Sequence, residues 1–242
     1  QQDDCTFHIR DLKKGLDRDE KNHILGLGIP AGLQNAIFAI ANLFIQGAVN
    51  SFDSVMVEGN SAAANADAII YNVMAAFYTA CSTFMGQNLG AKKRDRVLKS
   101  YFIGVAYSFL AGAILGGALF LFGKEFLSLF TNDAAVVEAG LLRTRIMCFS
   151  YAVSSFMDCT IAACRGIGKS LAPTVIVIIG SCIFRVVWIY TVFAYFHTIP
   201  SLYLLYIFSW TITAIAEIIC FAVNYKKLCS ADCSYACAEA RP

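Results

Sequence analysis

The stretch Tyr101–Gly123, YFIGVAYSFLAGAILGGALFLFG, decides the fold class, because it is apolar along its whole length and carries no charged side chain. An α-helix needs about 20 residues to cross the roughly 30 Å hydrocarbon core of a bilayer. The stretch reaches that length and predicts a transmembrane helix. Five further stretches resemble it, so we expect six spans, at about residues 24–50, 62–89, 101–123, 143–164, 171–196 and 199–225.

The overall composition favours the same fold class. Apolar residues make up 58% of the chain and charged residues 15%, whereas about a quarter of an ordinary soluble domain is charged. A soluble bundle of buried helices is the alternative, but six apolar helices in succession would leave no polar exterior. We therefore predict an all-α, polytopic membrane protein, a bundle of six transmembrane helices in the lipid bilayer.

The distribution of Lys and Arg predicts the orientation of the spans. Basic residues gather before the first span, in the second connection (residues 92–99) and after the last span, whereas residues 49–61 and 197–200 contain none. Short loops rich in Lys and Arg face the cytoplasm. We therefore expect a multi-pass protein of the plasma (inner) membrane with both termini in the cytoplasm.

Several function classes are excluded by the sequence. The net charge of +2 is too small to indicate nucleic-acid binding, and the basic clusters are explained by topology and anionic lipid. A glycine pattern at residues 26–31 contains Pro30 and opens a span, so it is not a phosphate-binding loop. Paired catalytic carboxylates and a serine elbow are also missing. We expect neither an enzyme nor a cofactor.

The ten cysteines do not indicate a disulfide framework. Most of them fall inside the predicted spans, where a free thiol packs as a small apolar group. Cys229, Cys233 and Cys237 recur every four residues in the tail, residues 229–242, and could line one helical face. Because the tail lacks histidines and paired CxxC spacing, we predict no metal site.

Polar stripes on the first two spans indicate a substrate path. Asn35, Asn42 and Gln46 share one helical face, and the second span has a similar stripe that includes Asn72 and Thr79. Polar groups in hydrocarbon are costly, so the stripes should face each other or a water-filled cavity, or form hydrogen bonds between helices alone. Aromatic residues accompany the amides and would suit an organic cation. We expect the path to be lined by Asn35, Asn42, Gln46, Asn72, Thr79, Phe38 and Phe77.

Ionisable residues inside the spans are candidates for coupling transport to H⁺ or Na⁺. They are Asp158, Glu217 and Arg185. The alternative is structural, with Arg185 forming an ion pair with Glu217 or Asp158. Asp67 lies close to the predicted outer surface, where we expect it to be merely interfacial.

Small residues recur every four positions along the third span. Gly104, Ser108, Gly112 and Gly116 form one edge, and such an edge lets a neighbouring helix backbone approach closely. We expect this edge to have a structural role.

Three motifs resemble those of the multidrug and toxic compound extrusion (MATE) family. They are GIPAGLQNAIFAIANLFIQGAVNSF (residues 28–52), FMGQNLGAKKRDRV (residues 84–97) and RGIGKSLAP (residues 165–173). Their order and spacing resemble the second half of such a transporter, and the resemblance covers roughly residues 24–228. The second and third motifs are the most specific.

The resemblance implies a twelve-helix antiporter with two six-helix lobes, which exchanges H⁺ or Na⁺ for organic cations. Residues 24–228 would be the carboxy-terminal lobe, and residues 1–23 the cytoplasmic linker to an amino-terminal six-helix lobe that this chain lacks. The chain starts at Gln1 without an initiator Met, which favours a piece of something longer. Asp158 matches a region where some sodium-coupled members keep an acidic residue. Their glutamate of the first helix has no counterpart in residues 38–40, and Asp53 stands where glycine is common.

Three functions follow from this sequence. The first is cation-coupled export of organic cations, drugs or metabolites by alternating access. The second is a flippase of lipid-linked precursors in the same superfamily, which a groove lined with arginines would favour. The third is a non-transporting, half-length membrane scaffold.

Overall fold

The described part of the chain contains six helices of membrane-spanning length. A computed structural model describes residues 18–239, with side chains described for residues 18–230. Five spans are single helices: α1 (Arg18–Val49), α2 (Ser54–Gly90), α3 (Arg94–Leu127), α4 (Ala134–Gly166) and α8 (Ile199–Glu239). The fifth consists of α5 (Leu171–Val177), η2 (Ile178–Ile183), α6 (Phe184–Trp188), η3 (Ile189–Phe193) and α7 (Ala194–Phe196). No β-strand occurs in residues 18–239, so the predicted all-α, polytopic fold is confirmed.

Several helices extend past the predicted spans. Helix α1 begins at Arg18 and so includes residues 18–23 of the predicted linker, and α8 continues into the cysteine-containing tail as far as Glu239. Residues 1–17 and 240–242 lie outside the described part of the chain. The side chains of Cys233 and Cys237 also lie outside it, so the predicted cysteine face of the tail stays a prediction.

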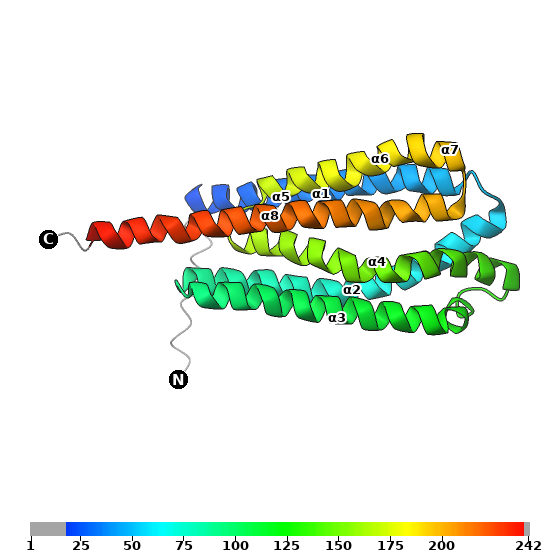
Figure 1. The fold of residues 1–242 in the computed structure, drawn as a ribbon, viewed down its shortest axis with the longest axis horizontal. Helices are drawn as coiled ribbons and strands as arrows, with labels where there is room; N and C mark the ends of the chain where they lie inside the picture. Colours follow the sequence, from blue (N-terminus) through cyan, green and yellow to red (C-terminus); the bar gives the residue numbers. More distant parts are fainter. Residues whose placement is uncertain (1–17, 240–242) are drawn as a thin grey trace, which may run out of the picture.

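Helix α4 lies at the centre of the bundle. In Figure 1, α1, α8 and the fifth span lie on one side of it, and α2 and α3 lie on the other. Contacts between the elements agree, since α4 packs extensively against α2, α3 and α8. Most of the apolar part of α4 is buried within the protein, unlike that of any other span. The remaining helices therefore reach lipid, or a partner, on their outer faces.

Small residues allow α4 to approach its neighbours. A Cβ atom on Gly59 of α2 would lie 2.7 Å from the backbone nitrogen of Gly140 in α4. On α3, a Cβ atom on Gly112 or Gly116 would lie 3.1 Å and 2.6 Å from the carbonyl oxygens of Tyr151 and Cys148, respectively. Such close backbone contact drives helix association in lipid, where apolar side chains gain little by meeting each other. The predicted small-residue edge of α3 is confirmed.

Two of the three motifs that carry the family resemblance end helices at one end of the bundle. After α4, Gly168 has a φ of +78°, and the amides of Gly168 and Lys169 donate to the carbonyls of Arg165 and Cys164. After α2, Lys92 takes the same role with a φ of 58°, and Lys93 donates to the carbonyl of Asn88 at 2.8 Å. Both patterns are Schellman caps, which satisfy the last carbonyls of a helix.

At the opposite end of the bundle, aspartate side chains cap the first turn of two helices. Asp53 accepts a hydrogen bond from the amide of Met56 at 2.9 Å, and Asp133 accepts one from the amide of Ala135 at 2.8 Å. A carboxylate at this N-cap position satisfies an amide that has no partner within the helix. Asp53 thus has a structural role at the start of α2.

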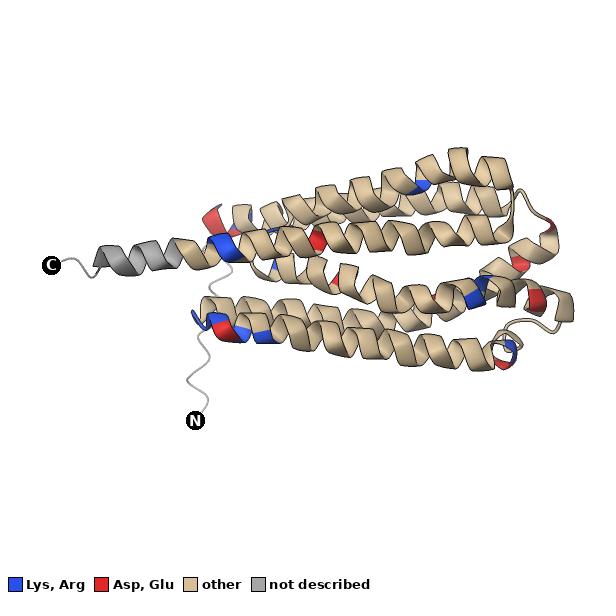
Figure 2. Ribbon diagram, in the orientation of Figure 1, with Lys and Arg blue, Asp and Glu red and all other residues tan. Residues whose placement is uncertain are grey.

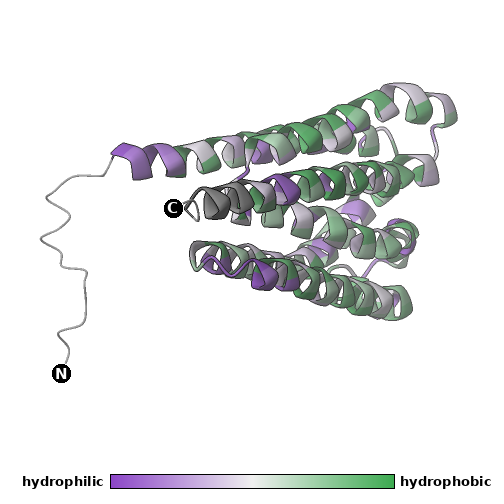
Figure 3. Cartoon of the chain, turned by 60° about the vertical axis from the view of Figure 1, so that its left-hand side comes forward, coloured by the Kyte–Doolittle hydropathy of each residue, from purple (hydrophilic) through white to green (hydrophobic). Residues whose placement is uncertain are grey.

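Charge and hydropathy divide along the length of the bundle. Figure 2 shows Lys and Arg gathered at the end of the bundle that holds both described ends of the chain, with Asp and Glu prominent at the opposite end. Figure 3 shows hydrophobic residues along the helices and hydrophilic residues mainly toward their ends. Large apolar side chains such as Ile114, Leu121 and Phe149 are more than three-fifths exposed. These surfaces require lipid around them.

The close contact between α3 and α4 gives a test of the fold. Replacing Gly116 by Ala would place a Cβ atom 2.6 Å from the Cys148 carbonyl oxygen, so we expect a loss of about 1–3 kcal/mol of stability. The apparent melting temperature of the detergent-purified protein, followed by circular dichroism, should fall. Gly117→Ala is the matched control, because nothing lies within 4 Å of that position. Equal melting temperatures for the two variants would contradict this packing.

Candidate functional site

A cavity of about 420 Å³ lies among α1, α2, α4, α6 and α8. Its wall combines amides, aromatic rings and four charged side chains, whereas the surrounding helices are mainly apolar. The polar and aromatic residues that line it are Phe38, Asn42, Gln46, Asn60, Asp67, Tyr71, Tyr78, Arg143, Asp158, Arg185, Tyr206 and Trp210. A concave space with a few convergent polar groups is the usual form of a small-molecule site.

Asp67 and Arg143 form an ion pair in the cavity wall. The same carboxylate accepts a hydrogen bond from the Tyr151 hydroxyl, and Arg143 Nη1 donates to the Asn60 carbonyl oxygen at 2.7 Å. The prediction that Asp67 is merely interfacial is wrong. The sequence showed the position of Asp67 along α2, but it did not show its partner Arg143 on α4. That partner allows the Asp67 charge to lie inside the bundle.

Aromatic rings surround the guanidinium group of Arg185, which is fully buried. Its central carbon lies 4.5 Å from the ring centre of Phe38, 4.6 Å from that of Tyr206 and 5.7 Å from that of Trp210. Rings from α1 and α8 thus provide cation–π contacts to one charge. Arg185 lies in α6, between the π-helical segments η2 and η3; such segments are frequent at functional sites.

Neutral groups complete the surroundings of Arg185. Its Nη1 donates to Asn42 Oδ1 at 3.2 Å, and its Nε donates to Ser209 Oγ at 3.4 Å. No ion pair to Glu217 or Asp158 is formed, so the structural ion pair that we considered is wrong. The reason is that aromatic faces and neutral acceptors from other helices occupy the positions around the guanidinium group.

Asp158 lines the same cavity without a direct partner. Among residues 18–230, its carboxylate forms no ion pair and no hydrogen bond appears for it. Arg185 and Arg165 are close enough to act on it electrostatically. A half-buried carboxylate that is not already paired can bind a proton, a metal cation or a cationic ligand.

The predicted path residues fall into two groups. Phe38, Asn42 and Gln46 line the cavity. The others lie outside it; they are Asn35, Asn72, Thr79 and Phe77. Asn72 and Thr79 are exposed on the surface of this chain, and Phe77 stacks on Tyr107 with ring centres 5.9 Å apart. A role for these four residues in the path stays a prediction.

Sequence reasoning missed part of the site. Tyr206 and Trp210 are one helical turn apart in α8, and that spacing was the available signal for an aromatic wall. Arg143, which also lines the cavity, was not among the predicted site residues. Glu217, a predicted coupling residue, does not line the cavity. It lies with Cys164 and Cys220 between α4 and α8.

The geometry and motifs can be compared with known proteins. The family model described as MatE matches residues 30–191, which run from the middle of α1 into η3 and include most of the cavity wall. The chain belongs to the MatE family. Membership confirms the predicted family, and with it the expectation that this chain is not an enzyme.

Curated relatives of this MatE-family chain have names that refer to drug resistance. The Probable multidrug resistance protein NorM of Thermotoga maritima is 25% identical over 175 residues, which cover 70% of this chain and 37% of the relative. The Probable multidrug resistance protein YpnP of Bacillus subtilis is 29% identical over 133 residues, 55% of this chain and 30% of the relative. The matched region thus spans well under half of each relative.

Solved structures share the fold of this MatE-family chain. A MOP superfamily transporter from Pyrococcus furiosus has a TM-score of 0.82 at 17% identity, over 92% of this chain and 50% of that one. An outward-facing multidrug resistance MATE family transporter has a TM-score of 0.80 at 18% identity, over 89% and 49%. The chain therefore has the fold of one six-helix half of these proteins.

The ion pair in the cavity wall predicts a specific pattern of stability. Asp67→Asn leaves the Arg143 charge buried without its counter-charge, so we expect a loss of about 3–5 kcal/mol. The double variant Asp67→Asn, Arg143→Gln removes both charges and should lose less than the single variant. Thermal unfolding of the detergent-purified variants measures this. The single variant Arg143→Gln is measured as well. If the double variant loses as much stability as the two single variants together, the pair does not stabilise the wall.

Proposed function

We propose that the chain forms one half of a cation-coupled exporter of organic cations, drugs or metabolites. The other half would be an amino-terminal six-helix lobe, since the solved structures that share the fold are about twice as long. One observation supports the proposal most strongly: Asp158 lines the same cavity as the aromatic rings. A carboxylate and aromatic faces are the two groups that attract an amphipathic cation.

The aromatic wall is suited to delocalised cations. Phe38, Tyr206 and Trp210 already surround one such cation, the guanidinium group of Arg185. A substrate with a similar flat, weakly hydrated charge would meet the same wall from the cavity side. The names of the curated relatives, probable multidrug resistance proteins, support export of such compounds by a transporter that contains this chain.

Asp158 is the carboxylate that we assign to coupling. The charge of Asp67 is already neutralised by Arg143, whereas Asp158 has no direct partner among the described side chains. H⁺ or Na⁺ bound at Asp158 would compete with a cationic substrate for the same charge. Each ligand would then favour a different facing of the cavity, which is the requirement for exchange by alternating access.

A flippase of lipid-linked precursors is the second candidate. The Nη2 atom of Arg185 is buried without a hydrogen-bond partner, so the cavity also offers a group for an anion. The related structure from Pyrococcus furiosus is described as having a binding pocket of reverse polarity that suggests a different function. The two candidates differ in whether transport depends on Asp158 or on Arg185.

Asp158→Asn tests the proposed coupling in a transporter that contains this chain together with its amino-terminal lobe. The amide has the same shape but cannot carry the charge, so we expect export of a fluorescent cation such as ethidium to fall about tenfold or more. Initial efflux rates from cells or proteoliposomes under an imposed H⁺ or Na⁺ gradient measure this.

The matched control is Asp133→Asn, which makes the same change at the start of the same helix. Asn caps a helix as well as Asp does, so efflux should stay at the level of the unchanged transporter. Efflux by Asp158→Asn that equals this control would remove Asp158 from the mechanism. If Arg185→Gln abolished translocation of a lipid-linked precursor in proteoliposomes and Asp158→Asn left it unchanged, the flippase would be favoured.

We also propose that the protein lies in the plasma (inner) membrane and that both of its termini lie in the cytoplasm. Lys and Arg gather at the end of the bundle where α1 begins and α8 ends (Figure 2), and the positive-inside rule assigns such an end to the cytoplasm. Alkaline phosphatase fused after Ala91 should be inactive, and the same enzyme fused after Phe130 should be active. The reverse pattern would contradict this orientation.

A further inference from the structure

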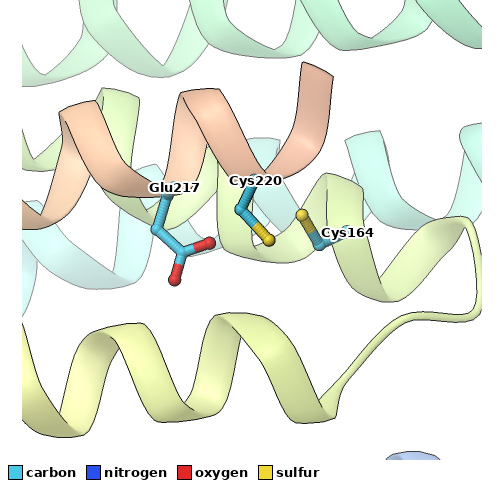
Figure 4. Close-up of side chains that lie close together, drawn as sticks. All are labelled: Cys164, Glu217 and Cys220. Atoms are coloured by element: carbon cyan, nitrogen blue, oxygen red, sulfur yellow. The ribbon is translucent and has the colours of Figure 1, made fainter. Parts of the chain in front are cut away.

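Three side chains with metal-binding groups meet between α4 and α8, outside the cavity. Cys164 comes from the end of α4, and Glu217 and Cys220 come from α8, where they are one turn apart. Their two sulfur atoms and a carboxylate oxygen all lie within 4.8 Å of one another. Figure 4 shows Cys164 and Cys220 with their thiols toward each other and Glu217 beside them on the same helix as Cys220.

The carboxylate of Glu217 has no partner in the described part of the chain. The residue is fully buried, and neither Oε1 nor Oε2 accepts a hydrogen bond from the described residues. A buried carboxylate without a partner is one of the costliest groups in a protein interior. A cation bound between the carboxylate and the two thiols would provide what the helices do not.

We propose that Cys164, Glu217 and Cys220 bind one thiophilic divalent cation of the Zn²⁺ type. Thiolate ligands select Zn²⁺ and similar ions over Mg²⁺ and Ca²⁺, which prefer sites made of oxygen atoms alone. Two thiolates and a carboxylate carry three negative charges. A divalent cation would neutralise two of these charges, and the Arg165 guanidinium acts electrostatically on Glu217 and Cys164. Occupation would therefore reduce the charge of a buried cluster.

The geometry of the cluster fits such an ion after small side-chain rotations. In a tetrahedral zinc site, Zn–S bonds of about 2.3 Å and Zn–O bonds of about 2.0–2.2 Å place the ligand atoms roughly 3.5–3.8 Å apart. The backbone of Cys164 is held by the cap of α4, where Lys169 N donates to its carbonyl oxygen at 2.9 Å. Asn224 Nδ2 donates to Cys220 Sγ at 3.3 Å, a contact that orients this sulfur and would stabilise its thiolate. Three protein ligands leave a fourth position for water.

A cation at this place would join two helices that contribute to the cavity. Asp158 lies less than two turns before Cys164 in α4, and Trp210 lies two turns before Glu217 in α8. Fixing α4 to α8 would oppose any rearrangement that separates these helices. The sequence predicted no metal site, because one ligand is remote in the chain from the other two and none belongs to a known metal-binding spacing.

Metal binding tests the proposal independently of transport. The purified chain, reduced and stripped of metal, would carry Cys229→Ser, Cys233→Ser and Cys237→Ser, so that the tail cannot bind. After addition of Zn²⁺ and removal of the excess by gel filtration, we expect this protein to hold about one Zn²⁺ per chain by mass spectrometry of the metal. Cd²⁺ should produce an ultraviolet thiolate charge-transfer band, and excess Mg²⁺ should not remove it.

Site variants and a matched control complete the experiment. Cys164→Ser, and the isosteric Glu217→Gln, which keeps the packing if the serine variant fails to fold, should each raise the Kd for Zn²⁺ about tenfold or more. Cys182→Ser is the control, a buried thiol in η2 outside the cluster, and should leave the Kd unchanged. Absence of stoichiometric Zn²⁺ binding, or an equal effect of Cys182→Ser and Glu217→Gln, would overturn the proposal.

Discussion

Charged side chains that are at least partly buried in the bundle need polar surroundings, and helix α4 carries three such side chains. Arg143 pairs with Asp67 on α2, Arg165 donates to Gln34 on α1 at 2.9 Å, and Asp158 faces the cavity. An unpartnered charge in hydrocarbon is costly, so these groups determine which helices can surround α4. Close packing at the glycines then allows those helices to approach, and the cavity forms where the partners are aromatic and polar rather than small.

The features that could be predicted from the sequence depend on length or local periodicity. Six apolar stretches of spanning length predict six helices whatever their arrangement. The small-residue edge from Gly104 to Gly116 repeats every four positions, so one face of one helix was sufficient to recognise it. The family motifs around Lys92 and Gly168 are local as well, because each caps a single helix. These predictions did not require knowledge of which helix lies beside which.

The features that could not be predicted depend on neighbours from other helices. The polar stripe that contains Asn72 identified one face of α2 but not the groups that this face contacts. The stripe lies outside the cavity of this chain. Asp67 looked interfacial because its partner comes from α4. The surroundings of Arg185 need rings from α1 and α8, and the cluster at Glu217 needs a thiol from α4. For Asp67, Arg185 and Glu217, the sequence showed an isolated polar residue, and only the packing of the bundle identified its neighbours.

Water access to the cavity is the most direct test of this account, since a polar cavity inside a lipid-embedded bundle is its central claim. Cysteine would be introduced at Ala64, which lines the cavity, or at Ala113, which is exposed on α3, in a cysteine-free background of the membrane-inserted transporter. The rate of labelling by a membrane-impermeant maleimide would be measured. The account predicts rapid labelling at Ala64 and none at Ala113. Equal rates at the two positions, or labelling at Ala113 alone, would contradict it.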